Sequence, residues 1–472
     1  MTGTDFLALS PMIALGLASV AVLLQSAVAR SRQAPFLLTL AGAIAAFALI
    51  PAASSVAPHQ ATSVIIVDHF SLFITGLLVA GGFAVALLAY GYFERRSEDK
   101  EEFYVLLLAA TFGSVLLVSS NHFISFFLGL EVLNVSLYIL IAYLGERKPL
   151  EAGLKYFVLA SASTAFLVFG MALVYAETGT MEFSRISFAT GADSAIFVTG
   201  FALVLGGLAF KLALVPFHMW TPDVYQGAPA PVTAFVATVS KGAVFALLLR
   251  FFIETDALSN PSMLLLISIL SAASMIAGNI LALMQNNIKR LLAYSSIAHL
   301  GYLLVAFVAG RDLAVPAATF YLVAYFISIL AAFGVVSVLS TAGKEPETLE
   351  EYRSLFWSRP WTALVLSASL FSLAGIPLTV GFIGKFFLLA AGVGSARWFL
   401  VLVLVLTSAI SIYYYLRVIV ALYSTPPEER VRPARQIIPW TGGIILAGLL
   451  VAMIWFGVYP SSIMNIIRSA IF

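Results

Sequence analysis

The sequence predicts an all-α polytopic membrane protein with about fourteen transmembrane helices. The chain of 472 residues is 61% hydrophobic and only 10% charged, whereas a soluble domain carries roughly 25% charged residues. Apolar runs of about 18 or more residues recur from one end of the chain to the other, and about 20 such residues span a bilayer as a helix. The runs lack the roughly 10-residue alternation of a transmembrane β-barrel, so helices are expected.

The expected helices follow one another with short loops between them. Their ranges are 6–29, 35–55, 70–93, 103–119, 121–144, 153–176, 194–216, 228–253, 262–285, 288–310, 313–341, 361–392, 397–424 and 437–459. The first run has no basic residue before it and is long for a signal peptide, so it is expected to stay as a helix. Four regions are expected: helices 1–3 in residues 1–102, a first repeat of helices 4–8 in 103–260, a second, inverted repeat of helices 9–13 in 261–425, and helix 14 in 426–472.

The distribution of basic residues over the loops supports this helix count. With the N-terminus outside, sixteen Lys and Arg residues fall in loops of the inner side and five fall on the outer side. The inner group includes Lys289, and the outer group includes Arg250. One missed or added helix would invert every later loop and remove the asymmetry. The pattern therefore predicts a multi-pass protein with both termini on the outer side.

Two of the apolar runs contain a proline together with a lysine. AFKLALVPF contains Lys211 and Pro216, and LAGIPLTVGFIGKFFLL contains Pro377 and Lys385. Proline removes a helical hydrogen bond, and lipid offers no partner for the freed carbonyl, so such breaks occur where protein or a water-filled cavity receives them. The seventh and twelfth helices carry the breaks, and they lie five helices apart. Because five is odd, the two would cross the membrane in opposite directions, which predicts an inverted repeat.

Four ionisable residues lie inside expected helices: Glu131, Lys211, Lys241 and Lys385. Each costs about 2.5–3.5 kcal/mol on insertion scales. Glu131 could pair with one lysine and lock two helices together, but at least two lysines would remain without a buried acid partner. A buried lysine of this kind holds its proton weakly and exchanges it near neutral pH. The set therefore predicts a proton relay, with a purely structural lock as the alternative.

Two histidines are further candidates for such a relay. His299 lies within a helix beside Ser295 and Ser296, and the unperturbed pKa of a histidine, about 6.5, suits proton transfer. The alternative for His299 is a hydrogen-bonded core residue. His218 follows Pro216 closely, so it could either relay protons or satisfy the broken backbone. The other three histidines are expected at the membrane interface, and the histidine spacing indicates no metal site.

Several classes of function are excluded by what the sequence lacks. Cysteine is absent, so the chain cannot form a disulfide or bind an Fe–S cluster through thiolates, and redox chemistry would have to take place on another chain. Neither a phosphate-binding glycine loop nor a nucleophile–base arrangement is present. The chain has no basic tail of the kind that would indicate nucleic-acid binding. Asp223, which follows Pro222, is expected to cap a helix or form a turn. We therefore expect no covalent chemistry on this chain.

Three segments resemble a known family. LVPFHMWTPDVYQGAPAPVTAF, NNIKRLLAYSSIAHLGYLL and LAGIPLTVGFIGKFF are similar to the subunit N family of bacterial proton-pumping NADH–quinone oxidoreductase, respiratory complex I, whose members are antiporter-like membrane subunits. The likeness extends over essentially the whole chain. The sequence motif TPDVYQGAPAPV and the presence of Lys385 favour subunit N over its sister subunits M and L. The chain also lacks the long lateral helix that extends subunit L.

The resemblance implies a role for each buried charge. Glu131 would pair with Lys211, Lys241 would be the central relay group, and Lys385 would lead toward the outer face, with His299 also in the relay. Movement of Glu131 away from Lys211 would then push a proton toward Lys241. The resemblance also implies that this chain holds no cofactor, and that NADH, FMN, Fe–S clusters and quinone bind to other subunits.

The resemblance further implies a location and partners. The chain would lie in the bacterial inner membrane, beside the antiporter-like subunit M and the small helical subunits of the complex. Three alternatives stay open: a subunit of a multi-subunit cation/proton antiporter with the same fold, a membrane scaffold whose charges only lock helices, and the membrane arm of a related hydrogenase. The wording TPDVYQGAP argues against the last of these.

Overall fold

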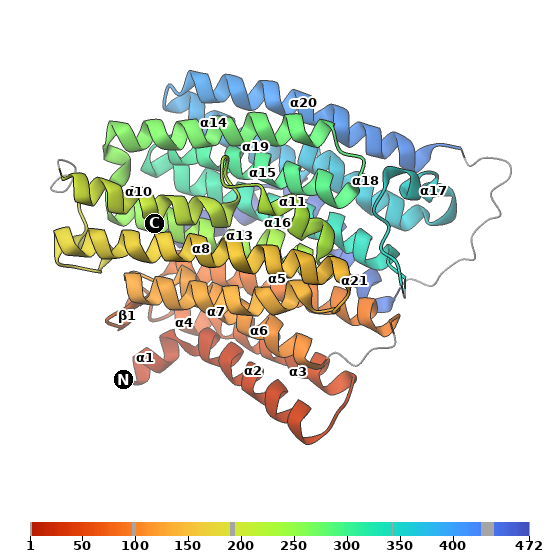
Figure 1. The fold of residues 1–472 in the computed structure, drawn as a ribbon, viewed down its shortest axis with the longest axis horizontal. Coiled ribbons are helices and arrows are strands. Elements are labelled where there is room, and N and C mark those ends of the chain that lie inside the picture. The colour runs from red at the N-terminus through yellow and green to blue at the C-terminus, as the bar shows by residue number, and fades with distance from the viewer. Residues whose placement is uncertain (1, 97–100, 189–193, 342, 426–438, 472) are drawn as a thin grey trace.

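Helices form nearly all of the protein, as the ribbon in Figure 1 shows. The computed structural model describes residues 2–96, 101–188, 194–341, 343–425 and 439–471. Within these ranges, 13 helical stretches are long and apolar enough to cross a membrane. Two shorter apolar helices, α18 (Pro360–Ala374) and α19 (Val380–Gly394), together supply one further crossing. The predicted fold class is confirmed.

The N-terminal region contains two elements that the sequence did not predict. Its helices and strands are α1 (Gly3–Ala8), α2 (Ser10–Val28), α3 (Gln33–Ala48), α4 (Ile50–Ser54), β1 (His59–Thr62), β2 (Ile65–Val67) and α5 (His69–Glu94). The predicted first helix is divided into α1 and α2, with Pro11 at the start of α2. The two strands form an antiparallel hairpin in which His59 pairs with Val67.

The next region contains the first broken helix. Its elements are α6 (Glu101–Val118), α7 (Phe123–Ala142), α8 (Arg147–Thr178), η1 (Phe183–Arg185), α10 (Ala195–Leu212), α11 (Trp220–Gly227), α12 (Ala230–Phe235), the π-helix η2 (Val236–Ser240) and α13 (Lys241–Glu254). Helix α8 begins six residues before its predicted start, at Arg147. The predicted run 194–216 ends early, at Leu212, and the chain resumes a helix at Trp220. The break expected around Pro216 is therefore present.

The remaining region contains the second broken helix. Its elements are η3 (Ala257–Ser259), α14 (Pro261–Leu283), α15 (Ile288–Phe307), α16 (Arg311–Leu339), η4 (Leu349–Tyr352), α17 (Leu355–Ser358), α18, α19, α20 (Trp398–Tyr423), α21 (Trp440–Val458) and α22 (Ser461–Ile471). The predicted run 361–392 is divided between α18 and α19. Helix α22 was not predicted, and its buried residues Met464 and Ile467 belong to the main core.

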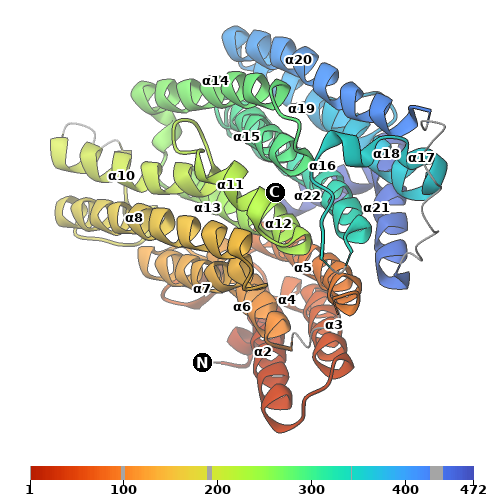
Figure 2. The same ribbon diagram turned by 45° about the vertical axis from the view of Figure 1, so that its right-hand side comes forward.

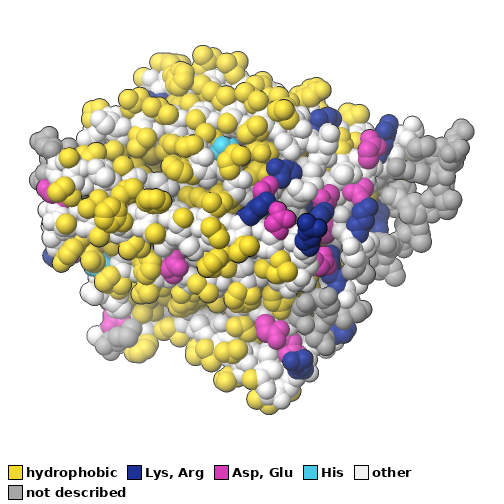
Figure 3. All heavy atoms as spheres, in the orientation of Figure 1, with side chains coloured by type: hydrophobic (Ala, Val, Ile, Leu, Met, Phe, Trp, Pro, Cys, Tyr) yellow, Lys and Arg dark blue, Asp and Glu magenta, His cyan; other side chains and the backbone are white. Residues whose placement is uncertain are grey.

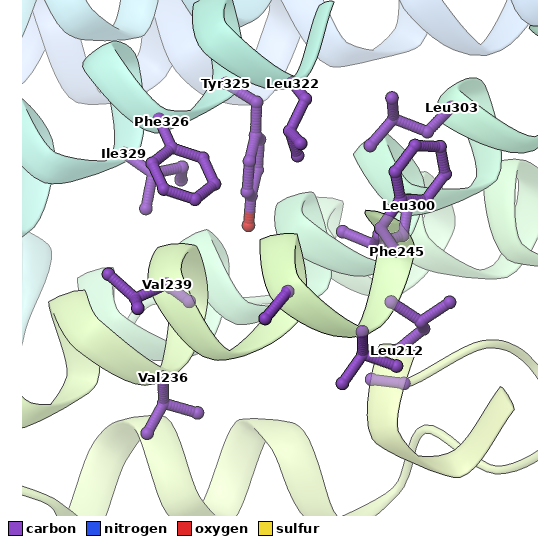
Figure 4. Packing of buried hydrophobic residues seen from close by; sticks show 14 of the residues in the cluster. Leu212, Val236, Val239, Phe245, Leu300, Leu303, Leu322, Tyr325, Phe326 and Ile329 are labelled. Atoms are coloured by element: carbon purple, nitrogen blue, oxygen red, sulfur yellow. The ribbon is translucent and has the colours of Figure 1, made fainter. Parts of the chain in front are cut away.

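Three crossings form the centre of the molecule. The stretch 230–254, helix α15 and most of α16 are completely or almost completely buried, whereas α2, α8 and α20 are largely exposed. Figure 2 shows α15 and α16 enclosed between α20 on one side and the helices of the first half on the other. Tyr325 of α16 points its hydroxyl group toward the helix formed by η2 and α13 (Figure 4). Lys211, Lys241, His299 and Lys385, which are discussed below, are buried in this interior, whereas Glu131 is partly buried.

Charged side chains gather at one end of the helices, while apolar side chains cover the middle of the surface (Figure 3). Ion pairs at this end join segments that are distant in sequence: Arg96–Glu146, Lys148–Glu347, Lys155–Asp223 and Arg290–Asp223. We call the end that contains these residues the charged end. It corresponds to the predicted inner loops. Four of the sixteen basic residues assigned to them, Lys100, Arg430, Arg432 and Arg435, lie outside the described residues.

Two basic residues that were counted as loop charges are instead buried in helices. Arg250 of α13 is 6% exposed and donates two hydrogen bonds of 2.8 Å to the carboxylate of Asp68. Lys289, in the first turn of α15, is fully buried and forms an ion pair of 2.6 Å with Glu345. The predicted helix ranges 228–253 and 288–310 already include the two residues, and the structure adds that each side chain has a carboxylate partner far away in sequence.

Candidate functional site

The first helix break is closed by protein groups. Lys211 lies in the last turn of α10, and Ala213 follows it in the left-handed region with a φ of 58°. The indole Nε1 of Trp220 donates a hydrogen bond of 2.9 Å to the carbonyl of Phe210. The backbone N–H of Val215 donates one of 3.0 Å to Ser274. The groups freed by the break thus have partners away from lipid, as a break at membrane depth requires.

Lys211 is joined to Glu131 through an amide. Its Nζ donates a hydrogen bond to Oδ1 of Asn134, and Nδ2 of Asn134 donates one of 2.8 Å to Oε1 of Glu131. Thr164 donates a second bond, of 3.2 Å, to the same carboxylate oxygen. Both partners lie in the described part of the chain, and no direct ion pair joins them. The two residues that the resemblance pairs are therefore linked through Asn134.

Lys211 also packs against aromatic side chains. Its Nζ is 3.5 Å from the hydroxyl of Tyr156 and 5.0 Å from the centroid of that ring. The ring of Tyr156 in turn contacts Trp220, with 5.0 Å between centroids. Trp220 is therefore placed between Lys211 and the next lysine, because Lys241 Nζ lies 6.0 Å from its ring.

Lys241 is bound by hydroxyl and aromatic groups alone. The side chain is 1% exposed, and its Nζ donates a hydrogen bond of 2.8 Å to Ser296 of α15. It also lies 5.3 Å from the ring centroid of Tyr225. Among the described residues no carboxylate forms an ion pair with it. The π-helix η2 ends directly before this lysine, and single π-turns of this kind are frequent at functional sites.

His299 lies on the same helix as Ser296 and is held by two tyrosines. Its Nδ1 forms a hydrogen bond of 2.6 Å with Tyr321, and its Nε2 forms one of 3.2 Å with Tyr415. The hydroxyl of Tyr415 also bonds Ser295. Both ring nitrogens of this buried histidine therefore have a hydroxyl partner.

Lys385 lies just beyond the second helix break. Its Nζ donates hydrogen bonds of 2.9 Å to the carbonyl of Ala374 and 2.8 Å to Ser408. The amine is 5.2 Å from the ring centroid of Tyr302, and the same ring contacts His299 at 5.4 Å between centroids. Tyr302 therefore lies between the histidine and the lysine.

Glycine permits this second break to close tightly. A Cβ atom on Gly381 would come within 1.9 Å of the carbonyl oxygen of Ser372, so α19 can approach the end of α18 only with glycine at this position. The hydroxyl of Ser372 accepts a hydrogen bond of 3.1 Å from the Gly381 N–H and one of 2.7 Å from Ser328 of α16. The break that positions Lys385 is thus fixed to α16.

The structure does not join His218 to this row of side chains. Both of its ring nitrogens are buried, and neither has a hydrogen-bond partner within the described residues. Asp223 was expected to cap a helix or form a turn, but it binds Arg290 at 2.7 Å and Lys155 at 2.9 Å instead. Over the described ranges, no group of three or more His, Cys, Asp or Glu side chains could hold a metal ion.

The arrangement forms a continuous row of polar groups through the interior. It runs from Glu131 through Asn134 to Lys211, and past Trp220 to Lys241 and Ser296. His299 lies three residues after Ser296 on α15, and Tyr302 and Lys385 follow it in the row. Asn134 was missed in the sequence, although its position three residues after Glu131 places both on one helix face.

The sequence is similar to that of known proteins over nearly its whole length. Residues 120–411 match the family described as NADH:quinone oxidoreductase/Mrp antiporter, TM. NADH-quinone oxidoreductase subunit N of Methylococcus capsulatus is 47% identical over 98% of this chain and 95% of its own length. The chain belongs to the NADH-quinone oxidoreductase subunit N family. A second member, subunit N of Ectopseudomonas mendocina, is 44% identical over 99% of this chain and 97% of its own length.

Solved structures share the fold. A chain of respiratory complex I from Thermus thermophilus superposes with a TM-score of 0.83 at 34% identity, over 96% of this chain and 98% of that one. A chain of the membrane-bound sulfane sulfur reductase, an archaeal respiratory membrane complex, superposes with a TM-score of 0.87 at 23% identity. The match covers 99% of this chain and 97% of that one. A chain of the Mrp complex from Dietzia sp. superposes with a TM-score of 0.86 at 20% identity. The match covers 100% of this chain and 97% of that one. At such low identity, the last two likenesses show the fold alone.

Proposed function

We propose that this chain is a proton-translocating membrane-arm subunit of a bacterial NADH–quinone oxidoreductase. Protons would pass along Glu131, Lys211, Lys241, His299 and Lys385 while quinone is reduced elsewhere in the complex. One observation supports this most strongly. Three lysines that are at most 5% exposed lie along one interior row, and among the described residues none of them has a carboxylate within ion-pair distance. A purely structural lock would give each lysine an acid partner.

The energetics require a switch in this row. Moving one proton against 100 mV costs about 2.3 kcal/mol, so a relay lysine must change its proton affinity by at least that amount. Exposed charges cannot supply such a change in proton affinity, because water screens them. A charge in a dry interior interacts strongly with its charged neighbours. We propose that rotation of the Asn134 amide makes and breaks the link between Glu131 and Lys211. When the link is broken, Lys211 would release its proton toward Lys241.

The remaining assignments are parts of the same proposal. The charged end would face the inside of a bacterial inner membrane and both termini would face outward, in agreement with the distribution of basic residues. Partners would be the antiporter-like subunit M and the small helical membrane subunits. FMN, Fe–S clusters, NADH and quinone would bind to other subunits, and no covalent chemistry would occur on this chain. His218 would act, if at all, from outside the main row.

Replacing Lys211 with Ala in the native host tests this function. We expect NADH-driven quinone reduction and proton uptake in membrane vesicles to fall together, because the proton has no acceptor beside Glu131. The control is Lys148→Ala, which removes an exposed lysine whose ion pair at the charged end contributes little. If both rates persist in an assembled Lys211→Ala complex, the lysine is structural and the proposal fails.

Replacing Asn134 with Leu tests the switch separately. The change keeps the branched shape of the side chain but removes the amide between Glu131 and Lys211, so we expect fewer protons pumped per electron in an assembled complex. Thr164→Val is the matched control, since it removes only the 3.2 Å bond to Glu131. An unchanged proton-to-electron ratio in Asn134→Leu would show that the amide does not transmit the change.

A cation/proton antiporter subunit is the second candidate, because the family that matches residues 120–411 is described as NADH:quinone oxidoreductase/Mrp antiporter, TM. Vesicles that contain the protein but no respiratory substrate would distinguish the two functions. Sodium-dependent proton flux in them would favour the antiporter, and its absence together with NADH-driven uptake would favour the first proposal.

A further inference from the structure

A buried ion pair lies between the charged end and the row of lysines. Lys289 is fully buried, and its Nζ donates hydrogen bonds of 2.6 Å to Oε2 of Glu345 and 2.6 Å to the carbonyl of Ala228. The relay proposed above uses neither Lys289 nor Glu345. Burying a lysine fully costs free energy, so its position requires a physical explanation.

The carboxylate of Glu345 reaches both the buried lysine and a cavity. Its Oε1 accepts hydrogen bonds from the hydroxyl of Tyr92 and, at 3.0 Å, from the N–H of Ala230. The same residue lines a cavity of about 430 Å³ at the charged end. Charged residues of both signs line the rest of this cavity: Arg96, Glu146, Lys148, Lys344, Glu347 and Glu351. Glu345 is thus the carboxylate of this cavity that also contacts Lys289.

Lys289 is aligned with the residue that holds Lys241. Lys289 and Ser296 are seven residues apart on α15, so they lie on one face of the helix at a separation of about 10 Å along its axis. Ser296 accepts the 2.8 Å hydrogen bond from Lys241. The end of α11 and the residue after it run beside this face, because the Ala228 carbonyl accepts a hydrogen bond from Lys289 and the Tyr225 hydroxyl lies 3.4 Å from Ser296.

We infer that Glu345 and Lys289 form the pair that loads protons from the charged end onto Lys241. This inference rests on the proposed relay. In one cycle, Lys289 gives a proton toward Lys241 by way of the hydroxyls of Tyr225 and Ser296. Glu345 takes a proton from water in the cavity and passes it to Lys289. One proton has then moved from the cavity to Lys241, and both members of the pair are back in their starting charge states.

A structural role is the competing explanation, and the chain offers a matched control for it. Glu347 lies on the same loop, lines the same cavity and also accepts three hydrogen bonds, from Lys148, Gln226 and Asn287 at 2.8–3.0 Å. Its carboxylate accepts no hydrogen bond from Lys289, and the nearby charge of Lys289 is only one of several causes that lower the pKa of Glu347. If the loop only needs anchoring, Glu345→Gln and Glu347→Gln should have the same effect.

The experiment compares these two variants in the intact complex in membrane vesicles, with rates normalised to assembled complex. For Glu345→Gln we expect quinone reduction and proton uptake to fall at least about tenfold, since a positioned proton-transfer group typically contributes about 10²–10⁴-fold. We also expect a larger solvent isotope effect in D₂O, since proton loading becomes rate-limiting. Glu347→Gln should keep the wild-type isotope effect. Equal isotope effects in the two variants would overturn the inference.

Two further variants keep the inference testable. If Glu345→Gln does not assemble, Glu345→Asp takes its place, because it retains the charge on a shorter side chain. This variant should assemble and show a raised solvent isotope effect. A wild-type isotope effect in Glu345→Asp would overturn the loading role. Lys241→Met separates this inference from the proposed function. If that variant pumps normally, the relay itself fails. If it does not pump while Glu345→Gln matches Glu347→Gln, the relay stands and the loading pair is wrong.

Discussion

Replacing Lys241 with Met is expected to abolish proton uptake without destabilising the subunit. The lysine is 1% exposed and its hydrogen bond goes to Ser296, so its loss should lower quinone reduction and uptake at least about tenfold. Methionine has a similar length and carries no charge. Because a buried charge costs about 2.5–3.5 kcal/mol on insertion scales, its removal should leave the fold as stable as before or more so. Both rates and the thermal stability of the purified complex are measured.

A second substitution separates charge from proton transfer at this position. Lys241→Arg keeps a positive charge, but a guanidinium group does not release its proton in a protein. We therefore expect Lys241→Arg to be as inactive as Lys241→Met. Normal pumping by either variant would contradict a relay role for this residue, and a large loss of stability in Lys241→Met would indicate a structural role.

Replacing Arg250 with Met should have the opposite effect on stability. Arg250 donates two hydrogen bonds of 2.8 Å to Asp68 and lies 3.3 Å from Glu254. Burial raises the pKa of Asp68, but the Arg250 guanidinium outweighs this effect and holds that pKa below its ordinary value. Without the arginine, two partly buried carboxylates lose their partner, which costs about 3–5 kcal/mol when a buried pair is broken. We expect less assembled complex and a lower melting temperature.

The control for this prediction is an arginine in an exposed pair. Arg185 is 74% exposed at its side chain and binds Glu182 at 2.9 Å, so Arg185→Met should change stability little. The double variant Arg250→Met with Asp68→Asn should recover part of the loss, because one of the unpaired carboxylates is also removed. Equal stability of Arg250→Met and Arg185→Met would show that the buried pair is not a structural lock.

The contrast between Arg250 and Lys241 shows which inferences a sequence can support. Both are basic residues in apolar helices, yet one is paired and the other is not. Arg250 was placed at the outer side because it lies near the end of a predicted helix, and its partner Asp68 precedes a different helix. Pairing between distant segments leaves no local pattern, so sequence periodicity could not separate a locked charge from a relay charge.

The sequence by itself determined the membrane class, the approximate crossings, the two breaks and the four charges at depth. These follow from local composition, since the cost of placing a lysine or a proline in lipid depends on the residues around it. Tertiary structure alone decided that Asn134 lies between Glu131 and Lys211, and that Lys289 is buried against Glu345. Both contacts bring together segments at least 50 residues apart, 77 for Asn134 and Lys211 and 56 for Lys289 and Glu345, and only the folded chain fixes such neighbours.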